Sequence, residues 1–336
     1  MKRLLVAFCL CLLVPVTANA AAKYLMRLGS IQAEDFYLHK MTNRMAELVK
    51  EKTNGEVEVK LFPSSVLGSE RDMIEGMRMG SLESMLGYGG VLALYVPEFD
   101  VLNMPYVFEN YAQIHKVLGG EIGKDLAERY FKATNGSVRI VWYLDHAFRQ
   151  VFTSNKKIEK MADCKGVKIR SVESPIYIET FKAMGLAPTP MPFGEIYTAV
   201  QTHVVDGHEQ EESGMVSMKF YEIEKFGAVT NHIYNPAPLH ISELFLKKLP
   251  EATRKALLEA VVEAGMWWNE QEGLAEKEQV TARDWLIKEK GVVFTYPDIG
   301  EFKNALLPLQ DQFAEKLGPA TVEMLKRVRE ATAGVK

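Results

Sequence analysis

Apolar and polar residues alternate along the chain in two different spacings. Between Glu34 and Lys52, apolar side chains return every three or four residues, which predicts an amphipathic helix. Residues 57–61 instead alternate apolar and charged side chains, the pattern of a strand with one solvent-facing side. Segments of the two kinds follow each other along most of the chain. This order predicts an α/β fold.

The same two patterns predict the other elements of the first 200 residues. Strands are expected at 24–28, 82–87, 138–144, 167–170 and 187–191. Helices are expected at 70–79, within 109–134, at 174–184 and at 193–202. No exact internal repeat and no low-complexity tract interrupts this order.

The C-terminal part has a different pattern. Residues 251–291 contain no proline and have a helical pattern almost throughout. Forty residues of unbroken helix would measure roughly 60 Å, whereas a globule of this size has a radius of gyration of roughly 20 Å. The segment therefore predicts a helix that crosses the whole molecule, with a bend at Gly265 or Gly273, or else two ordinary helices that separate at Gly273.

The first 20 residues have the pattern of a secretory signal peptide. Lys2 and Arg3 precede an apolar run from Leu4 to Val16, and Ala18-Asn19-Ala20 supplies small residues for cleavage. This run is too short to cross a bilayer, and no later segment has 18 uninterrupted apolar residues. We therefore expect cleavage after Ala20 and an exported protein that does not insert into the membrane.

Charge and cysteine content narrow the possible partners. The chain has 40 Lys and Arg residues against 44 Asp and Glu; without Lys2 and Arg3 the balance is 38 to 44, a net charge of −6. Because no polybasic tract is present, we expect no binding to nucleic acids or anionic membranes. An anionic ligand would need locally placed cations. Only Cys164 follows the leader, which excludes an intramolecular disulfide, and it is expected to be a small buried side chain.

Local signatures of several common enzymes are absent. The sequence has no Walker loop and no G-x-S-x-G elbow. His208-Glu209 is followed by Glu212 where a zinc-protease helix needs a second histidine. The acidic residues Glu209, Glu211 and Glu212 indicate a solvated helix start or, as the alternative, a site for a hard cation. We expect no metal and no cofactor.

Two arginines follow strand-like segments in the region 140–212. Arg149 comes shortly after the strand expected at 138–144, and Arg170 ends the strand expected at 167–170. A guanidinium at a strand end can reach into a cleft and hold a carboxylate through two parallel hydrogen bonds. Considered in isolation, such an arginine is more often half of a structural salt bridge.

The sequence around these arginines resembles one protein family. Asp163-Cys164-Lys165-Gly166-Val167-Lys168-Ile169-Arg170 resembles the D-x-K-G-x-K-x-R signature of the solute-binding proteins of TRAP transporters, the tripartite ATP-independent periplasmic family. Further segments resemble the family in the same order: 62–71, 80–83, 102–108, 188–197, 205–209 and 230–232. The resemblance therefore covers essentially the whole chain after the leader.

This resemblance implies a two-lobed periplasmic binding protein of the class II type, with hinge strands and a long C-terminal helix that bridges the lobes. The implied lobe I comprises residues 21–146 and about 236–275, and lobe II comprises 147–235 and about 276–336. The resemblance also implies a monomeric periplasmic receptor that is not an enzyme. Such a receptor captures a small organic acid through an arginine clamp and delivers it to the membrane subunits of a TRAP transporter.

The resemblance also implies ligand-binding residues. Arg170 matches the arginine that makes a bidentate salt bridge to the ligand carboxylate, and Arg149 matches a second ligand-facing arginine. Phe193 matches an aromatic residue beside the ligand. Gln210 occurs where many relatives have Asn, and Tyr88 where some relatives have an acidic or small polar residue. Two further candidates, which can equally be structural, complete the predicted pocket: Glu70 and His146.

The sequence leaves two alternatives and the identity of the ligand open. A binding protein that serves a sensor kinase would have a similar pocket. A periplasmic enzyme acting on a carboxylated substrate is a further alternative, because a pair of catalytic carboxylates leaves no local signature. Dicarboxylates, keto acids, sugar acids, sialic acid and aromatic acids are all compatible with one arginine clamp.

Overall fold

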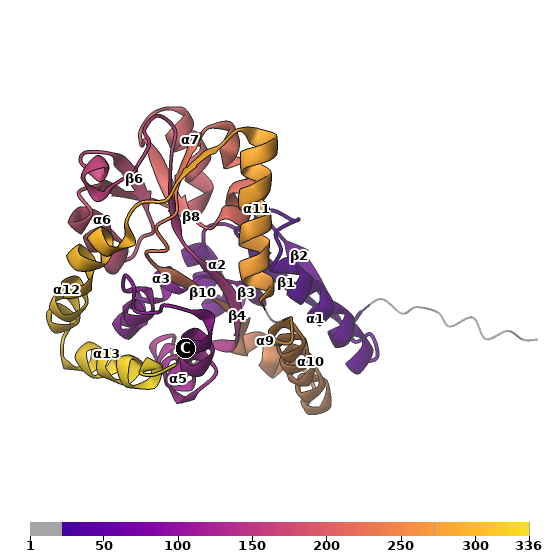
Figure 1. Ribbon diagram of the computed structural model, residues 1–336. Helices are drawn as coiled ribbons and strands as arrows, with labels where there is room; N and C mark the ends of the chain where they lie inside the picture. The colour runs from indigo at the N-terminus through magenta and orange to yellow at the C-terminus, as the bar shows by residue number, and fades with distance from the viewer. Residues whose placement is uncertain (1–21, 272, 336) are drawn as a thin grey trace, which may run out of the picture.

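The computed structural model describes residues 22–271 and 273–335 and consists of two lobes (Figure 1). The predicted signal peptide and its cleavage point after Ala20 lie outside these residues. Within the described ranges, no helix is long and apolar enough to cross a membrane.

Eleven strands of the described residues form two separate sheets. They are β1 (Tyr24–Ser30), β2 (Val57–Phe62), β3 (Ser84–Leu86), β4 (Val138–Phe148), β5 (Gln150–Thr153), β6 (Lys168–Ser171), β7 (Ala187–Pro190), β8 (Gly207–Gln210), β9 (Phe226–Ala228), β10 (Tyr234–Ser242) and β11 (Val293–Thr295). The order β2-β1-β3-β10-β4 forms the sheet of the first lobe, and β11-β9-β5-β8-β6-β7 forms the sheet of the second lobe. Both sheets mix parallel and antiparallel pairs.

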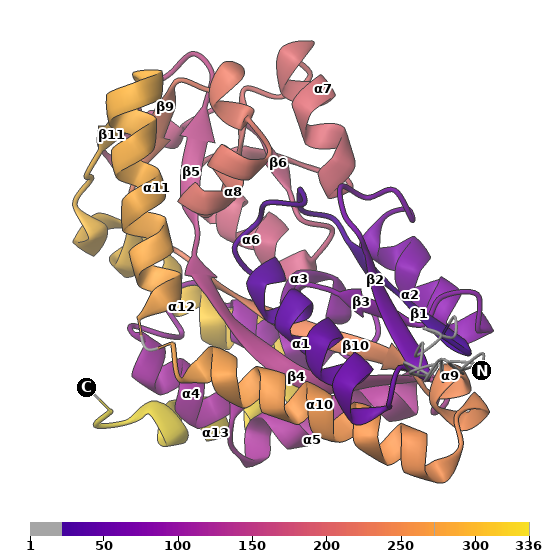
Figure 2. The same ribbon diagram turned by 90° about the vertical axis from the view of Figure 1, so that its right-hand side faces the viewer.

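Helices cover both sheets (Figures 1 and 2). The α-helices are α1 (His39–Lys52), α2 (Glu70–Met79), α3 (Gly89–Leu92), α4 (Tyr111–Leu118), α5 (Glu121–Ala133), α6 (Pro175–Ala183), α7 (Ile196–Gln201), α8 (Glu212–Ser217), α9 (Glu243–Lys248), α10 (Glu251–Asn269), α11 (Leu274–Lys290), α12 (Ile299–Leu317) and α13 (Pro319–Thr332). The 3-10 helices are η1 (Pro97–Asn103), η2 (Met161–Cys164), η3 (Phe193–Glu195) and η4 (Phe220–Glu222).

The predicted alternation of strands and helices is confirmed, and two helices show where the pattern succeeds and fails. Helix α2 has the predicted bounds because Ser69 and Asp72 form a capping box at its start and Gly80, at φ 77°, ends it in the left-handed region. Helix α1 begins at His39, later than predicted. The apolar residues before it, 36–38, are buried in a turn, so packing continues the apolar spacing where no helix forms.

The C-terminal helical region is two helices rather than one. Gly273, at φ 69°, lies at the start of α11 in a left-handed conformation that interrupts the helical path. Gly265 instead stays inside α10, where it packs on Trp142. Helix α10 lies along α1 and β4 in the first lobe, and α11 packs against α8 in the second (Figure 2). The region therefore spans both lobes, with its break at Gly273.

The chain also crosses between the sheets at two hydrogen-bonded points. Arg149 is the single residue between β4 and β5, and residues 229–233 connect β9 to β10. The N–H of Arg149 donates to the carbonyl of Ile233 (2.8 Å), and the N–H of His232 donates to the carbonyl of Arg149 (3.3 Å). The lobe boundaries expected from the sequence remain a prediction. Helix α13, at the end of the chain, packs against α4 and η1.

The close approach of α10 to β4 leads to a stability prediction for Gly265→Ala. Alanine normally stabilises a helix interior relative to glycine by about 1 kcal/mol. Here an added Cβ would lie 2.3 Å from ring atoms of Trp142. We therefore expect the substitution to lower the free energy of unfolding by about 1 to 3 kcal/mol, measured by urea denaturation. Gly194→Ala is the control, because its nearest neighbour would be the Ser65 hydroxyl at 3.6 Å. An unchanged or higher midpoint for Gly265→Ala would contradict this packing.

Candidate functional site

A small cavity lies between the two lobes. Its volume is about 20 Å³, room for about one water molecule, so the lobes are closed on each other here. The first lobe contributes residues that follow β1 and β3, and the second lobe contributes residues from β6, β8 and η3. The residues that line it are Ile31, Gln32, Glu70, Tyr88, Gly90, Val91, Arg149, Arg170, Val172, Phe193, Gln210 and Asn235.

The structure brings six of the seven predicted site residues to this cavity: Arg149, Arg170, Phe193, Gln210, Tyr88 and Glu70. The exception is His146, whose ring lies behind Tyr88 with ring centroids 5.1 Å apart. Its Nδ1 is 3.0 Å from the carbonyl oxygen of Asn235, and its Nε2 is 3.4 Å from a carboxylate oxygen of Glu211. Both neighbours belong to the protein, so the ring of His146 has a structural position behind the cavity lining. The ligand-binding role of the other six stays a prediction.

Arg170 is buried without a carboxylate partner. It sits on β6 and is 4 % exposed, and no acidic side chain of the described residues forms an ion pair with it. Its Nε–H donates to the carbonyl of Met191 (3.0 Å), and its guanidinium carbon lies 5.9 Å from the ring centroid of Phe193. Burial lowers the pKa of Arg170 to about 10, an effect that the more distant Glu209 opposes.

Arg149, in contrast, is fully engaged by a protein carboxylate. Its Nε–H donates to Glu209, and its Nη2 donates to the Oε1 of Glu209 (3.0 Å) and to the backbone carbonyl of the same residue (2.6 Å). Both side chains are buried. Although burial disfavours the charged carboxylate, Arg149 and His232 lower the pKa of Glu209 to about 2. The pair is therefore ionised, and Glu209 compensates the charge of Arg149.

Glu70 faces the cavity from the start of α2. Its Oε1 accepts a hydrogen bond from the backbone N–H of Tyr88 (2.7 Å). Burial raises the pKa of Glu70 to about 7, although the Tyr88 N–H and the positive charges of Arg170 and Arg149 favour its ionised form. Glu70 therefore changes protonation near neutral pH, close to the unpaired guanidinium.

Several polar atoms around the cavity have no hydrogen-bond partner in the described part of the chain. They are the hydroxyl of Tyr88, both amide atoms of Gln210, the Oε1 of Gln32 and the Oδ1 of Asn235. Buried polar groups are normally paired, so these atoms are placed to meet polar groups of a bound molecule. The sequence analysis missed Gln32 and Asn235. For Gln32 the available signal was a polar amide just after an apolar strand, because residues beyond strand ends face the crevice of such folds, whereas Asn235 lies inside β10 and had no such signal.

The acidic run at the end of β8 and the start of α8 meets basic side chains of the protein. Glu209 binds Arg149, Glu211 lies against His146, and Glu212 accepts from Arg283. All three carboxylates are buried, so the expectation of a solvated helix start is wrong. Each faces a basic side chain of the protein, and within the described residues no cluster of three His, Cys, Asp or Glu is arranged to hold a metal ion. The hard-cation alternative therefore has no support in this geometry.

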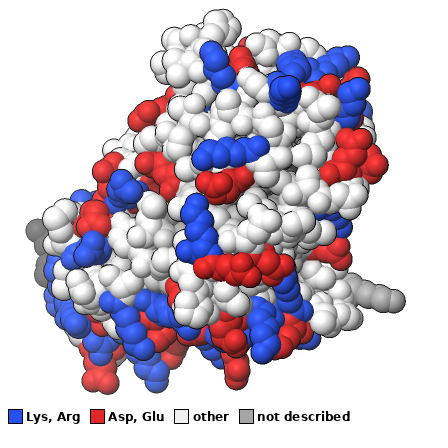
Figure 3. Space-filling view, turned by 90° about the vertical axis from the view of Figure 1, so that its left-hand side faces the viewer, with Lys and Arg blue, Asp and Glu red and all other residues white. Residues whose placement is uncertain are grey.

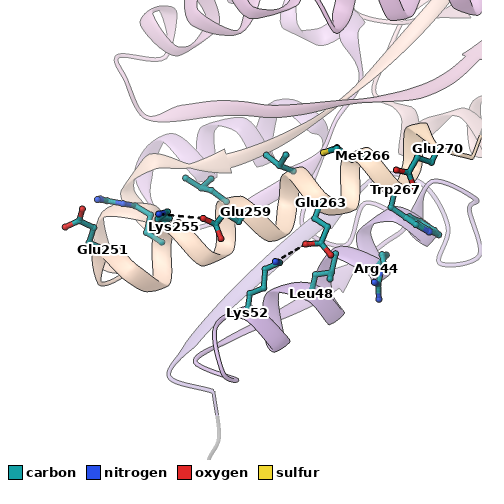
Figure 4. Close-up of a pocket in the computed structure, with 13 residues that line it drawn as sticks. Arg44, Leu48, Lys52, Glu251, Lys255, Glu259, Glu263, Met266, Trp267 and Glu270 are labelled. Carbon is teal, nitrogen blue, oxygen red and sulfur yellow. Dashed lines mark ion pairs between the residues drawn. The ribbon is translucent and has the colours of Figure 1, made fainter.

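A larger hollow lies elsewhere, between α1 and α10 (Figure 4). Its volume is about 950 Å³. Charged side chains of both signs line it, and Lys52 and Glu263 form an ion pair across it (2.8 Å). Its apolar side chains range from buried, as Leu48 is, to exposed, with Met266 at 54 %. None of its lining side chains is a buried polar group without a partner, so this hollow has no feature that would select a small charged ligand.

Comparisons with known proteins agree with this geometry. Residues 28–317 match the family model of the bacterial extracellular solute-binding proteins, family 7. The chain is 33 % identical over 316 residues to the 2,3-diketo-L-gulonate-binding periplasmic protein of Escherichia coli, with 94 % of each chain covered. Among solved structures, it resembles the sugar acid binding protein of Advenella mimigardefordensis in complex with galactonate, with a TM-score of 0.85, 27 % identity, and 93 % and 99 % of the two chains covered.

A second solved structure extends the range of ligands. It is a TRAP periplasmic solute-binding protein of Sulfurospirillum deleyianum with bound succinate, which gives a TM-score of 0.84 and 26 % identity and covers 94 % and 100 % of the two chains. The family model spans most of the chain, and both lobes are shared with these structures. The chain therefore belongs to family 7 of the bacterial extracellular solute-binding proteins, the periplasmic solute-binding proteins of TRAP transporters.

Proposed function

We propose that this protein is a periplasmic receptor that captures an organic acid at Arg170 and delivers it to the membrane subunits of a TRAP transporter. The observation that carries this proposal is the buried guanidinium of Arg170, which has no ion-pair partner among the described residues. Burying a charge without a partner is costly, so such a group is suited to a ligand anion. A carboxylate matches the planar fork of the guanidinium through two parallel hydrogen bonds.

The surface charge supports a locally placed cation rather than general attraction of anions. On the face shown in Figure 3, basic and acidic side chains are interspersed without a broad area of one sign. The formal net charge of the whole chain is −4. An anionic ligand therefore gains its affinity inside the crevice, where closure excludes water and strengthens its pairing with Arg170.

The other cavity groups favour a hydroxylated monocarboxylate. Arg170 is the one arginine of the cavity lining without a carboxylate partner, because Arg149 is held by Glu209. A second ligand carboxylate would meet Glu70, whereas ligand hydroxyls would meet the unpaired atoms of Tyr88 and Gln210. We therefore propose a sugar acid as the ligand class. The galactonate-bound and diketogulonate-binding relatives support this choice over the succinate-bound one.

Binding requires the lobes to move. The cavity has room for about one water molecule, so a sugar acid enters when the lobes part and is then enclosed in a crevice that is less tightly closed than this one. We propose that the closed form is what the membrane subunits recognise. A receptor for a sensor kinase would close in the same way, and uptake of labelled acid by cells with and without the TRAP membrane subunits separates these two partners.

The proposed receptor is not an enzyme. The family consists of solute-binding proteins, and the cavity groups identified here serve binding. Incubation of the purified protein with galactonate should return the acid chemically unchanged, as judged by mass spectrometry. Formation of a product at a rate that follows the protein concentration would favour the alternative of a periplasmic enzyme.

Arg170→Ala should weaken acid binding more than hundredfold. Removing one partner of a buried ion pair costs about 3 to 5 kcal/mol, a large part of the roughly 8 kcal/mol that a micromolar receptor has. Calorimetric titration with the best acid from a thermal-shift screen measures this loss. Arg329→Ala, in which an exposed arginine on α13 is replaced, is the matched control and should bind normally. Unchanged affinity in Arg170→Ala would refute the proposed clamp.

Gln210→Leu tests the hydroxyl contacts. The substitution removes an amide whose two polar atoms have no partner in the described residues. A ligand hydroxyl left unpaired in a closed cavity costs about 1 to 3 kcal/mol. We expect galactonate to lose about ten- to hundredfold in affinity, while a short acid without that hydroxyl changes little. Gln201→Leu, at an exposed glutamine on α7, is the control. Equal losses for both acids would argue against a hydroxylated ligand.

Glu70 should make binding depend on pH. A bound carboxylate offsets the positive charge of Arg170 that favours ionised Glu70, so the pKa of Glu70, about 7 without ligand, rises on binding. The complex then holds more protons than the free protein, and affinity falls as pH rises through about 7. Calorimetry in buffers of different ionisation enthalpy measures this proton uptake. Glu70→Gln should abolish it, and uptake that persists in this variant would exclude Glu70 as its source.

A further inference from the structure

We propose that Asp100 of the first lobe caps helix α6 of the second lobe and so acts as a latch that holds the crevice closed. Asp100 lies on η1, and its carboxylate meets the start of α6. It does not line the ligand cavity. The inference rests on the proposed function, because closing the lobes matters for a protein that encloses a ligand. Asp100 is thus a positioning residue.

The start of α6 lacks a cap of its own. Ser174 is the N-cap residue, yet its side chain makes no capping hydrogen bond within the helix. Pro175, the first helical residue, has no N–H, so the first backbone donor of the helix is that of Ile176. The carboxylate of Asp100 accepts from the hydroxyl of Ser174, at 2.7 Å, and the nearby N–H of Ile176 favours its ionised form. Asp100, which precedes Ser174 by 74 positions, therefore takes the place of a local cap.

This contact joins the two lobes. The 3-10 helix η1 packs against β10 and α3 in the first lobe, whereas α6 packs against β6 and β7 in the second. Two neighbouring contacts cross the same boundary. The hydroxyl of Tyr177 donates to the Oδ1 of Asn103 (3.5 Å), and Gly90 approaches Val172 so closely that an added Cβ would lie 2.8 Å from its side chain. Asp100 therefore lies within a continuous interface between the lobes.

The contact between Asp100 and the start of α6 is polar and buried. Asp100 is 1 % exposed and Ser174 is fully buried, and no basic side chain of the described residues forms an ion pair with Asp100. The positive end of α6 and two hydrogen-bond donors stand in for a cation. When the lobes part, the carboxylate, the hydroxyl and the N–H all gain access to water. Removing the acceptor therefore penalises the closed form, in which the buried Ser174 hydroxyl loses its partner, more than the open form.

The latch also bears on the ligand cavity. Ser174 follows Arg170 by four residues, and Val172, between them, lines the cavity. Fixing the start of α6 against η1 therefore restrains residues 171–174, which connect Arg170 to this helix. Through this connection Asp100 can influence how long a bound acid stays enclosed, although it contacts no ligand.

The test compares Asp100→Leu, which removes the acceptor at similar size, with Asp100→Asn, which keeps a carbonyl acceptor. Galactonate affinity and dissociation rate are measured by calorimetry and stopped-flow fluorescence. Spin labels at the exposed positions Met79 and Val204, one on each lobe, report the distance between the lobes. The control is Asp298→Ala, which removes a cap that lies within a single helix start.

We expect Asp100→Leu to weaken galactonate binding by about ten- to hundredfold, mainly through faster dissociation, and to reduce the short-distance population. Asp100→Asn should stay within about threefold of the wild type. Asp298→Ala should lower the melting temperature alone. If Asp100→Leu lowers only the melting temperature and leaves affinity and distances unchanged, the residue is merely structural and the latch is refuted.

A second comparison separates the latch from the proposed function. If the wild-type protein binds no acid, the receptor proposal fails, and the latch is judged on the ligand-free distance distributions. Loss of the short-distance population in Asp100→Leu then supports the latch, and identical distributions overturn it. If Asp100→Leu does not fold, Ser174→Ala replaces it, with an expected loss of about three- to tenfold because it removes the same hydrogen bond while the carboxylate still faces the positive end of α6.

Discussion

A buried positive charge that the protein leaves uncompensated is the central constraint on this structure. The crevice contains two guanidinium groups, and the second lobe supplies one carboxylate, that of Glu209, in direct contact with Arg149. Arg170 has a carbonyl oxygen and an aromatic ring as its nearest partners. Because an isolated charge in a dry environment is unfavourable, the closed crevice is most stable when an anion occupies the place beside Arg170.

Arg149 contributes to the connection between the lobes as well as to the charge balance of the crevice. Arg149 is the residue at which the chain leaves the first sheet and enters the second, and its backbone pairs with the other crossing segment. Its partner Glu209 lies on β8, directly beside β5 in the sheet. The pair is therefore anchored at the point about which the lobes can move, so the charge on Arg149 stays compensated while the distance between the lobes changes.

Polar groups therefore recur at the boundary between the lobes. On one side of the crevice, His146 of the first sheet lies against Glu211, which follows the second sheet. On the other, Asp100 meets the start of α6. Apolar contacts tolerate small displacements, whereas hydrogen bonds and ion pairs need specific distances. A boundary built from such contacts favours a defined closed arrangement over a range of partly closed ones.

The sequence by itself determined the α/β class, most element positions and six of the residues around the cavity. These features follow from local spacing or from short motifs such as the segment that ends at Arg170, because apolar periodicity reports which face of an element is buried. Tertiary structure alone decided which charges meet. The resemblance assigned Arg170 and, as a second contact, Arg149 to the ligand, and Glu209 was expected to be solvated, yet Arg149 is paired with that glutamate and Arg170 is not. The cap of α6 by Asp100 was equally hidden. Ion pairs and caps of this kind join residues tens of positions apart, and their partners depend on how the strands are ordered in space, which no local pattern encodes.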